Sequence, residues 1–237
     1  MPRRLFSCLR ERRRLHIQNH HIHLITDRKQ TKGDESAALH AALRGGVDII
    51  QIREKSAVSA LALFETANEI LPVAHEHGAA VSINDRLDVA LATGADGVHL
   101  AGKSLPPDAA RKLWGELLGV SIHSLEEAKS AVESGVDYVT FGHVYPTSSK
   151  PGMAPRGVRE LARIVDNVSI PVVAIGGIEA SNVDEVLSTG ASGIAAISTI
   201  LTAEDPEHAA RKLREAVDAY GAPPKTPFPR KSEKSVP

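Results

Sequence analysis

Histidine is the residue type in this chain best suited to proton transfer at neutral pH, and His123 is its best-placed example. It directly follows Leu118–Ile122, an apolar run of the length typical of a buried strand. An imidazole that titrates near neutrality can accept a proton and return it. We therefore interpret His123 as the candidate catalytic base, with a purely structural histidine as the alternative. His143 is a second candidate.

Two glycines, Gly176 and Gly177, follow another apolar run, and Ile197 and Ser198 stand at the end of the last one. Glycine lets backbone amides approach an anion closely, and the start of a helix adds a favourable dipole. The loops after the seventh and eighth strands are the usual phosphate position of (β/α)₈ barrels. These residues predict a phosphate site, and a tight turn without a ligand is the alternative.

Two cations, Arg53 and Lys55, stand on alternate positions after the run Val47–Ile52, so their side chains point the same way. Such a pair suits a pyrophosphate or a carboxylate, and pairing with Glu54 at the surface is an equal alternative. The hydroxyl-rich segment Tyr145-Pro-Thr-Ser-Ser-Lys150-Pro-Gly could close over a substrate, although its composition alone favours a flexible surface loop.

The elements that position these residues are short β-branched runs, which alternate with helical patterns. Eight runs are found: His23–Thr26, Val47–Ile52, Ala79–Ile83, Gly97–Leu100, Leu118–Ile122, Tyr138–Phe141, Ile170–Ile175 and Gly193–Ile197. Helical spacing marks Ser56–His77, Pro106–Trp114, Leu125–Glu133, Val158–Val165, Val183–Leu187 and Pro206–Ala219. Such alternation predicts an α/β fold, a single (β/α)₈ TIM barrel, in which reactive residues come from the strand-to-helix loops. An open doubly wound sheet is the alternative, but no GxGxxG follows the first strand.

The composition fits one globular domain whose core is aliphatic, because aromatic residues make up only 3% of the chain. The single cysteine, Cys8, excludes an intramolecular disulfide framework and a cysteine-cluster metal site. Nothing resembles a signal peptide, and no apolar run approaches the ~20 residues of a membrane span. We expect a cytoplasmic location and no membrane partner.

The formal net charge of −1 conceals a division of the chain. Residues 1–14 hold six arginines, and residues 221–237 hold four basic residues and five prolines. The body, 15–220, is left with 18 basic and 27 acidic residues, which argues against nucleic-acid binding. We expect residues 1–20 to be a disordered basic extension, 21–220 to form the barrel and 221–237 to be a disordered Pro/Lys-rich tail.

Six motifs, in order, resemble the thiamine phosphate synthase family, which includes a thiazole tautomerase branch. The resemblance covers about residues 22–220. The motifs are Gln51-Ile-Arg-Glu-Lys55, Asn84-Asp-Arg-Leu-Asp-Val-Ala90, Ala95-Asp-Gly-Val-His-Leu100, Gly119-Val-Ser-Ile-His123, Phe141-Gly-His-Val-Tyr-Pro-Thr147 and Ala174-Ile-Gly-Gly-Ile178. The resemblance implies a (β/α)₈ barrel that binds its ligands at the strand ends, and a homodimer.

The resemblance also implies roles for particular residues. Arg53, Lys55 and Asn84 would face the pyrimidine or carboxylate side of the pocket. Thr147, Ser149 and Lys150 would contact the substrate from the loop after the sixth strand, and Gly177 and Ser198 would hold the thiazole phosphate.

Two departures from the synthase pattern favour the tautomerase branch. The resemblance implies that the synthase holds Mg²⁺ with two aspartates, of which Asp85 matches the first. The second would fall in Ala101-Gly-Lys-Ser104, where Ser104 supplies no anionic oxygen. His143 also stands where the synthase usually has proline, as in the tautomerase branch.

We therefore expect a cofactor-free thiazole tautomerase, an isomerase that shifts a proton on a carboxylated thiazole phosphate with His123 as the base. One alternative is a thiamine phosphate synthase, which would couple a pyrimidine pyrophosphate to thiazole phosphate with Mg²⁺ at Asp85. The other is a non-catalytic regulatory protein that binds thiazole phosphate.

Overall fold

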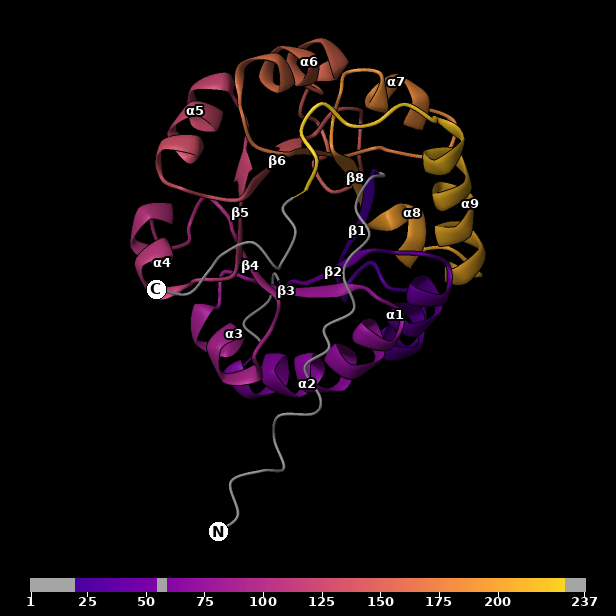
Figure 1. Ribbon diagram of the computed structural model, residues 1–237. Helices are drawn as coiled ribbons and strands as arrows, with labels where there is room; N and C mark the ends of the chain where they lie inside the picture. Colours follow the sequence, from indigo (N-terminus) through magenta and orange to yellow (C-terminus); the bar gives the residue numbers. More distant parts are fainter. Residues whose placement is uncertain (1–19, 55–58, 229–237) are drawn as a thin grey trace.

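Eight parallel strands pair in chain order and close into a barrel, with the helices around its outside (Figure 1). The computed structural model describes residues 20–54 and 59–228. The strands are β1 (His21–Ile25), β2 (Ile49–Ile52), β3 (Ala80–Asn84), β4 (Gly97–Leu100), β5 (Leu117–Ile122), β6 (Tyr138–Gly142), β7 (Val172–Ile175) and β8 (Gly193–Ala196). The predicted fold class, a single (β/α)₈ barrel, is confirmed.

The helices follow the strands in alternation. They are α1 (Glu35–Arg44), α2 (Ala60–Glu76), α3 (Leu87–Thr93), α4 (Pro107–Leu113), α5 (Leu125–Glu133), α6 (Gly157–Asn167), α7 (Val183–Leu187), α8 (Ser198–Leu201) and α9 (Pro206–Ala219). None of the helices in the described part of the chain is both long and apolar enough to cross a membrane.

Aliphatic side chains on both faces of the strands explain why these runs form a barrel. Every residue of β2, β3 and β4 is buried. Successive side chains of a strand point to opposite faces. Ile50 accordingly packs in the large core under the helices, whereas its neighbour Ile49 packs in a smaller cluster with Tyr138 inside the barrel.

Side-chain caps begin several of the helices and fix where each loop ends. The Ser124 hydroxyl accepts a hydrogen bond from the Glu127 amide at the start of α5, and the Asp34 carboxylate accepts one from the Ala37 amide at α1. The cap on α5 therefore fixes the short connection from β5 to α5, which contains His123 and Ser124.

The chain after α9 crosses the amino-terminal end of the barrel, where it is drawn in yellow in Figure 1. Phe228 is buried there and stacks on the ring of His21, with ring centroids 4.6 Å apart. The Ser192 hydroxyl donates a hydrogen bond to the Thr226 carbonyl over 2.6 Å. Residues 221–228 belong to the tail for which we predicted disorder, but the apolar ring of Phe228 gives this stretch a packed position. Residues 1–19 and 229–237 lie outside the described residues.

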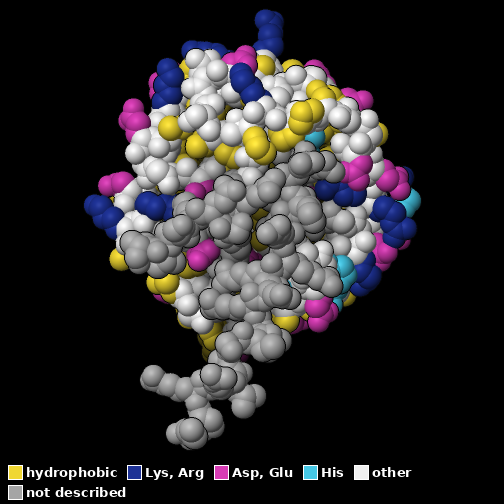
Figure 2. Space-filling view, in the orientation of Figure 1, with side chains coloured by type: hydrophobic (Ala, Val, Ile, Leu, Met, Phe, Trp, Pro, Cys, Tyr) yellow, Lys and Arg dark blue, Asp and Glu magenta, His cyan; other side chains and the backbone are white. Residues whose placement is uncertain are grey.

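Figure 2 views this same end of the molecule and shows acidic and basic side chains mixed around its periphery. The described side chains that remain uncovered in this view form no continuous basic patch.

Removal of the Phe228 ring tests how tightly residues 221–228 pack against the amino-terminal end of the barrel. We expect Phe228→Ala to lower the free energy of unfolding by about 3 kcal/mol, because the loss of a buried ring leaves a cavity against His21 and Tyr138. Urea unfolding measures the change. Phe64→Ala is the matched control, since Phe64 is 36% exposed, and it should cost about 1 kcal/mol or less. Equal costs for the two variants would contradict the packing described.

Candidate active site

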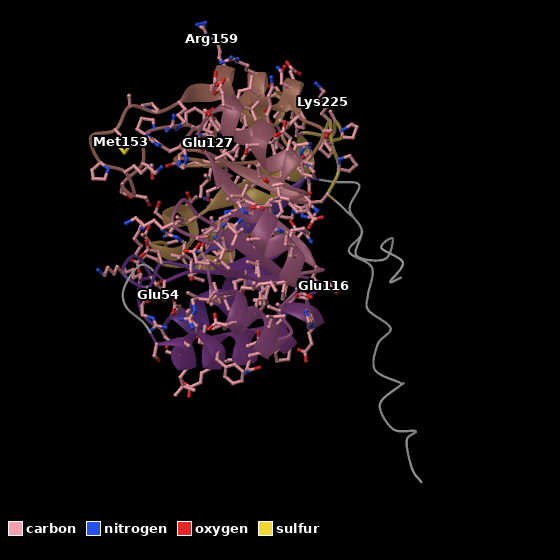
Figure 3. The ribbon with its side chains drawn as sticks, turned by 90° about the vertical axis from the view of Figure 1, so that its left-hand side faces the viewer. Glu54, Glu116, Glu127, Met153, Arg159 and Lys225 are labelled. Atoms are coloured by element: carbon pink, nitrogen blue, oxygen red, sulfur yellow. The ribbon has the colours of Figure 1, made fainter. Side chains whose placement is uncertain are left out.

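A cavity of about 330 Å³ opens at the carboxyl ends of the strands. Its walls come from, or directly follow, all eight strands, from Ile25 of β1 to Ser198 after β8. Figure 3 shows the barrel from the side: Glu54 and Met153 mark the end with the cavity, and Glu116 and Lys225 mark the opposite end. This is the end at which (β/α)₈ enzymes carry their active sites.

The structure brings together most of the residues that the sequence analysis selected. The predicted site residues found in the cavity wall are Arg53, Asn84, His123, His143, Thr147, Ser149, Lys150, Gly176, Gly177, Ile197 and Ser198. Lys55 lies outside the described residues. Asp85 lies on the rim with its side chain exposed, next to the cavity wall formed by Asn84.

The turn after β7 has a shape that only glycine allows. Gly176 has φ +101°, and a Cβ there would lie 2.4 Å from the Cβ of His143. Gly177 has φ +66°, and its Cβ would lie 2.4 Å from the Pro146 carbonyl oxygen. The Asn182 side chain donates to the Gly177 carbonyl over 2.9 Å, and Thr199 donates to the Ile178 carbonyl over 2.8 Å. The turn is therefore fixed, and its backbone can approach an anion closely.

The floor of the cavity is a chain of hydrogen-bonded amides. The Gln51 side chain donates to Asn84 Oδ1 over 2.8 Å, and the Asn84 amide donates to Asp85 Oδ2 over 2.7 Å. Gln51 and Asn84 are buried, so these bonds set which of their edges face the cavity. A fixed row of amide groups can recognise a flat, polar ring.

A buried histidine supports the floor from below. His99 lies between the Tyr138 hydroxyl, 3.0 Å from its Nδ1, and the Ser121 hydroxyl, 2.9 Å from its Nε2. Burial lowers the pKa of His99 to about 4, so the ring is neutral at physiological pH. The ring thus orients Ser121, which lines the cavity, without adding a charge beneath it.

Several cavity residues lie within strands and were not predicted from the sequence. Gln51, Ser121 and Thr140 line the cavity but belong to runs that we selected for their apolar character. Their spacing could have identified two of them as cavity residues. Gln51 stands two positions before Arg53, and Ser121 stands two positions before His123. Residues two apart on a strand face the same side.

Asp85 joins the loops after β3 and β4. Its Oδ1 accepts hydrogen bonds from the Ala101 amide, over 3.0 Å, and from the Ser104 hydroxyl. Its backbone is left-handed, with φ +62°, a conformation that aspartate tolerates. In the described part of the chain, no group of three or more His, Cys, Asp or Glu side chains is placed to hold a metal ion.

Both candidate histidines line the cavity and have hydrogen-bond partners at one or both ring nitrogens. His123 Nδ1 lies 3.3 Å from Glu127 Oε2, and His123 Nε2 lies 3.4 Å from the Lys150 ammonium. His143 is buried, and its Nε2 lies 3.2 Å from the Met153 carbonyl oxygen. His143 Nε2 therefore donates its hydrogen to this carbonyl, and the buried Nδ1 is left with no hydrogen-bond partner among the described residues.

Comparison with known proteins gives the relationships of this chain. The family model for thiamine monophosphate synthase matches residues 22–200. A putative thiamine-phosphate synthase of Geobacter sulfurreducens is 45% identical over 196 residues, which cover 81% of this chain and 92% of that protein. The thiamine-phosphate synthase of Chloroflexus aurantiacus is 42% identical over 205 residues, which cover 85% and 94%.

A solved structure agrees with these relatives. The thiamine phosphate pyrophosphorylase of Pyrococcus furiosus superposes with a TM-score of 0.79 at 37% identity, covering 86% of this chain and 98% of that one.

These relatives overturn our prediction of an isomerase. They are named as synthases at 42–45% identity over most of their length, so the thiazole tautomerase assignment is wrong. Ser104 and His143 depart from the synthase pattern at only two positions. These two positions do not outweigh the similarity over the rest of the sequence. The six motifs themselves pointed to the right relatives: the chain belongs to the thiamine monophosphate synthase family.

Proposed function

We propose that this protein is a thiamine-phosphate synthase, which joins a pyrimidine pyrophosphate to a thiazole phosphate and releases pyrophosphate. One observation carries the proposal: a single cavity contains both a fixed glycine turn and the cations Arg53 and Lys150. Such a cavity suits two anionic substrates bound together. The names of the relatives support the same reaction.

In this reaction the thiazole ring nitrogen forms a bond to the methylene carbon of the pyrimidine. The bond from this carbon to the pyrophosphate oxygen breaks, and the oxygen keeps the electron pair. Negative charge therefore grows on the leaving group, and no proton needs to be removed. Arg53 and Lys150 would stabilise this charge, and the hydroxyls of Thr147 and Ser149 would donate hydrogen bonds to it.

The remaining parts of the cavity orient the two rings. The thiazole phosphate would bind at Gly177 and Ser198, where the rigid turn admits an anion. The pyrimidine would lie over the amide row of Gln51 and Asn84, whose edges are fixed by their mutual hydrogen bond. Alignment of two bound reactants converts a bimolecular step into an effectively unimolecular one.

The residues present fit a magnesium ion that arrives with the pyrophosphate. Mg²⁺ usually keeps several waters and takes one or two carboxylates together with substrate phosphates, and Asp85 supplies one exposed carboxylate. When bound, the ion would neutralise charge on the leaving group. The Ser104 hydroxyl donates to this carboxylate and keeps it turned toward the loop after β4.

The Ser104 position gives a test of this metal site. We expect Ser104→Asp to lower the Mg²⁺ concentration needed for half-maximal activity by about 10-fold, because a second carboxylate joins Asp85. Magnesium titrations of initial rate measure the effect. Ser104→Asn, of similar size but neutral, should not strengthen magnesium activation. An unchanged magnesium requirement in Ser104→Asp would place the ion away from Asp85.

Growth of a bacterial strain that lacks its own thiamine-phosphate synthase tests the proposed function. We expect the gene for this chain to restore growth without added thiamin. Lys150→Ala, produced at the same level, should support growth poorly, because the leaving group loses a cation. Failure of the wild-type protein to restore growth, despite its presence in soluble form, would count against the proposal.

A further inference from the structure

Three side chains from separate elements form a row at the rim. Glu127 lies on α5, His123 directly follows β5 and Lys150 lies in the loop between β6 and α6. Glu127 Oε2 lies 2.6 Å from the His123 backbone nitrogen and 3.3 Å from Nδ1 of the ring. On the other side, His123 Nε2 lies 3.4 Å from the Lys150 ammonium. The ring is thus held between a carboxylate and a cation.

The chemistry of the two outer groups fixes which nitrogen of His123 carries the hydrogen. An ammonium has three donors and no acceptor, so Nε2 must accept from Lys150 through its lone pair. Nδ1 then carries the hydrogen and donates it to the Glu127 carboxylate. Hydrogen bonds in ligand-free sites are often long and shorten when the ligand binds. The Nε2 atom of His123 therefore accepts a hydrogen bond from Lys150 at the cavity, and the Nδ1 hydrogen points to Glu127.

Lys150 and His123 both line the cavity, and Lys150 is the cation of the row. Its stem has four rotatable carbons, and an ammonium on such a stem loses much conformational entropy when it is held in one place. It is half-buried, and burial together with the neighbouring Arg156 lowers the pKa of its ammonium. An acceptor beside this ammonium favours its charged form and fixes its direction.

We propose that His123, backed by Glu127, is a positioning residue that aims the Lys150 ammonium at the pyrophosphate of the substrate. This inference rests on the proposed function, in which Lys150 stabilises the leaving group. It assigns His123 a role different from the proton transfer that the sequence suggested. The coupling reaction removes no proton, and both ring nitrogens are already engaged.

Binding of inorganic pyrophosphate, measured by calorimetry, tests the inference without turnover. We expect His123→Ala to weaken this binding about 10-fold, and Lys150→Ala to weaken it at least as much. The double variant should bind no more weakly than Lys150→Ala, because His123 acts only through the lysine. His77→Ala is the control, since His77 is exposed at the carboxyl end of α2, outside the cavity, and the substitution should not change pyrophosphate binding. Additive losses in the double variant would overturn the inference.

Two further measurements separate positioning from a merely structural role. His123→Gln keeps an acceptor oxygen and should bind pyrophosphate within about 3-fold of the wild type. In protein labelled with ¹³C-lysine, the Lys150 Cε resonance, assigned with K150R, should move in His123→Ala and return in His123→Gln. A resonance that stays in place in both variants would contradict the contact with Lys150.

The outcomes also distinguish the inference from the proposed function. If the wild-type protein forms no thiamin phosphate, the proposed function is wrong, whatever the pyrophosphate affinities of the variants. A wild-type protein that forms thiamin phosphate, with His123→Ala losing rate but not pyrophosphate affinity, would leave the function intact and overturn the positioning role.

Discussion

Gly177→Ala is expected to reduce the kcat/KM for thiamin phosphate formation by about 100-fold or more. The new Cβ would lie 2.4 Å from the Pro146 carbonyl oxygen and 2.8 Å from the Tyr145 Cβ, closer than real contacts allow. Gly177 also has φ +66°, where alanine is strained. The turn and the loop that carries Lys150 must therefore move apart, and a displacement near 1 Å can cost 10²-fold in rate.

The control for this substitution lies in the same cavity. Gly102 lines the cavity as well, but a Cβ there meets nothing within 4 Å. Gly102→Ala should therefore keep its activity within about 3-fold of the wild type. Circular dichroism at the assay temperature would confirm that Gly177→Ala remains folded. A folded Gly177→Ala enzyme with normal kcat/KM would show that the turn does not hold the thiazole phosphate.

The protein is expected to lose stability steeply between pH 7 and pH 5. Burial lowers the pKa of His21, of His23 and, to about 4, of His99. In the unfolded chain these rings take up protons near pH 6.5, so below that pH the unfolded state binds more protons than the folded state. His99 alone contributes about 2 kcal/mol that is present at pH 7.5 and lost by pH 5, and the other two act in the same direction.

Urea unfolding at pH 7.5 and pH 5.0 measures this loss. In His99→Asn one titrating ring is gone, so the difference between the two pH values should shrink by about 2 kcal/mol. His77→Asn, at an exposed histidine, should leave the difference unchanged. Equal free energies of unfolding at the two pH values in the wild type would mean that the buried rings do not titrate on unfolding.

The barrel could be predicted because its strands are buried on both faces and so appear as continuous aliphatic runs. Gly97–Leu100 was predicted with the bounds that the structure gives to β4. The helices α1, α3 and α8 were not among the segments that we singled out. Two of them have only seven and four residues, too few to show a helical period, and their helical form depends on packing against the sheet.

The rim residues could be predicted because a parallel barrel gathers the carboxyl ends of its strands at one end. The hydrogen-bond partners of each rim side chain could not be predicted from the sequence. One partner of His123 is Lys150, 27 positions away, and only the closed barrel brings the two together. The weight of Ser104 was also misjudged, because magnesium needs as few as one protein carboxylate when the substrate supplies phosphate oxygens.

The most direct test of the account is a ³¹P NMR time course of the purified protein with Mg²⁺, the pyrimidine pyrophosphate and the thiazole phosphate. The account predicts that pyrophosphate and thiamin phosphate appear together in equal amounts, and that neither appears when one substrate is left out. Pyrophosphate released without thiamin phosphate, or no turnover by protein that binds both substrates, would contradict it.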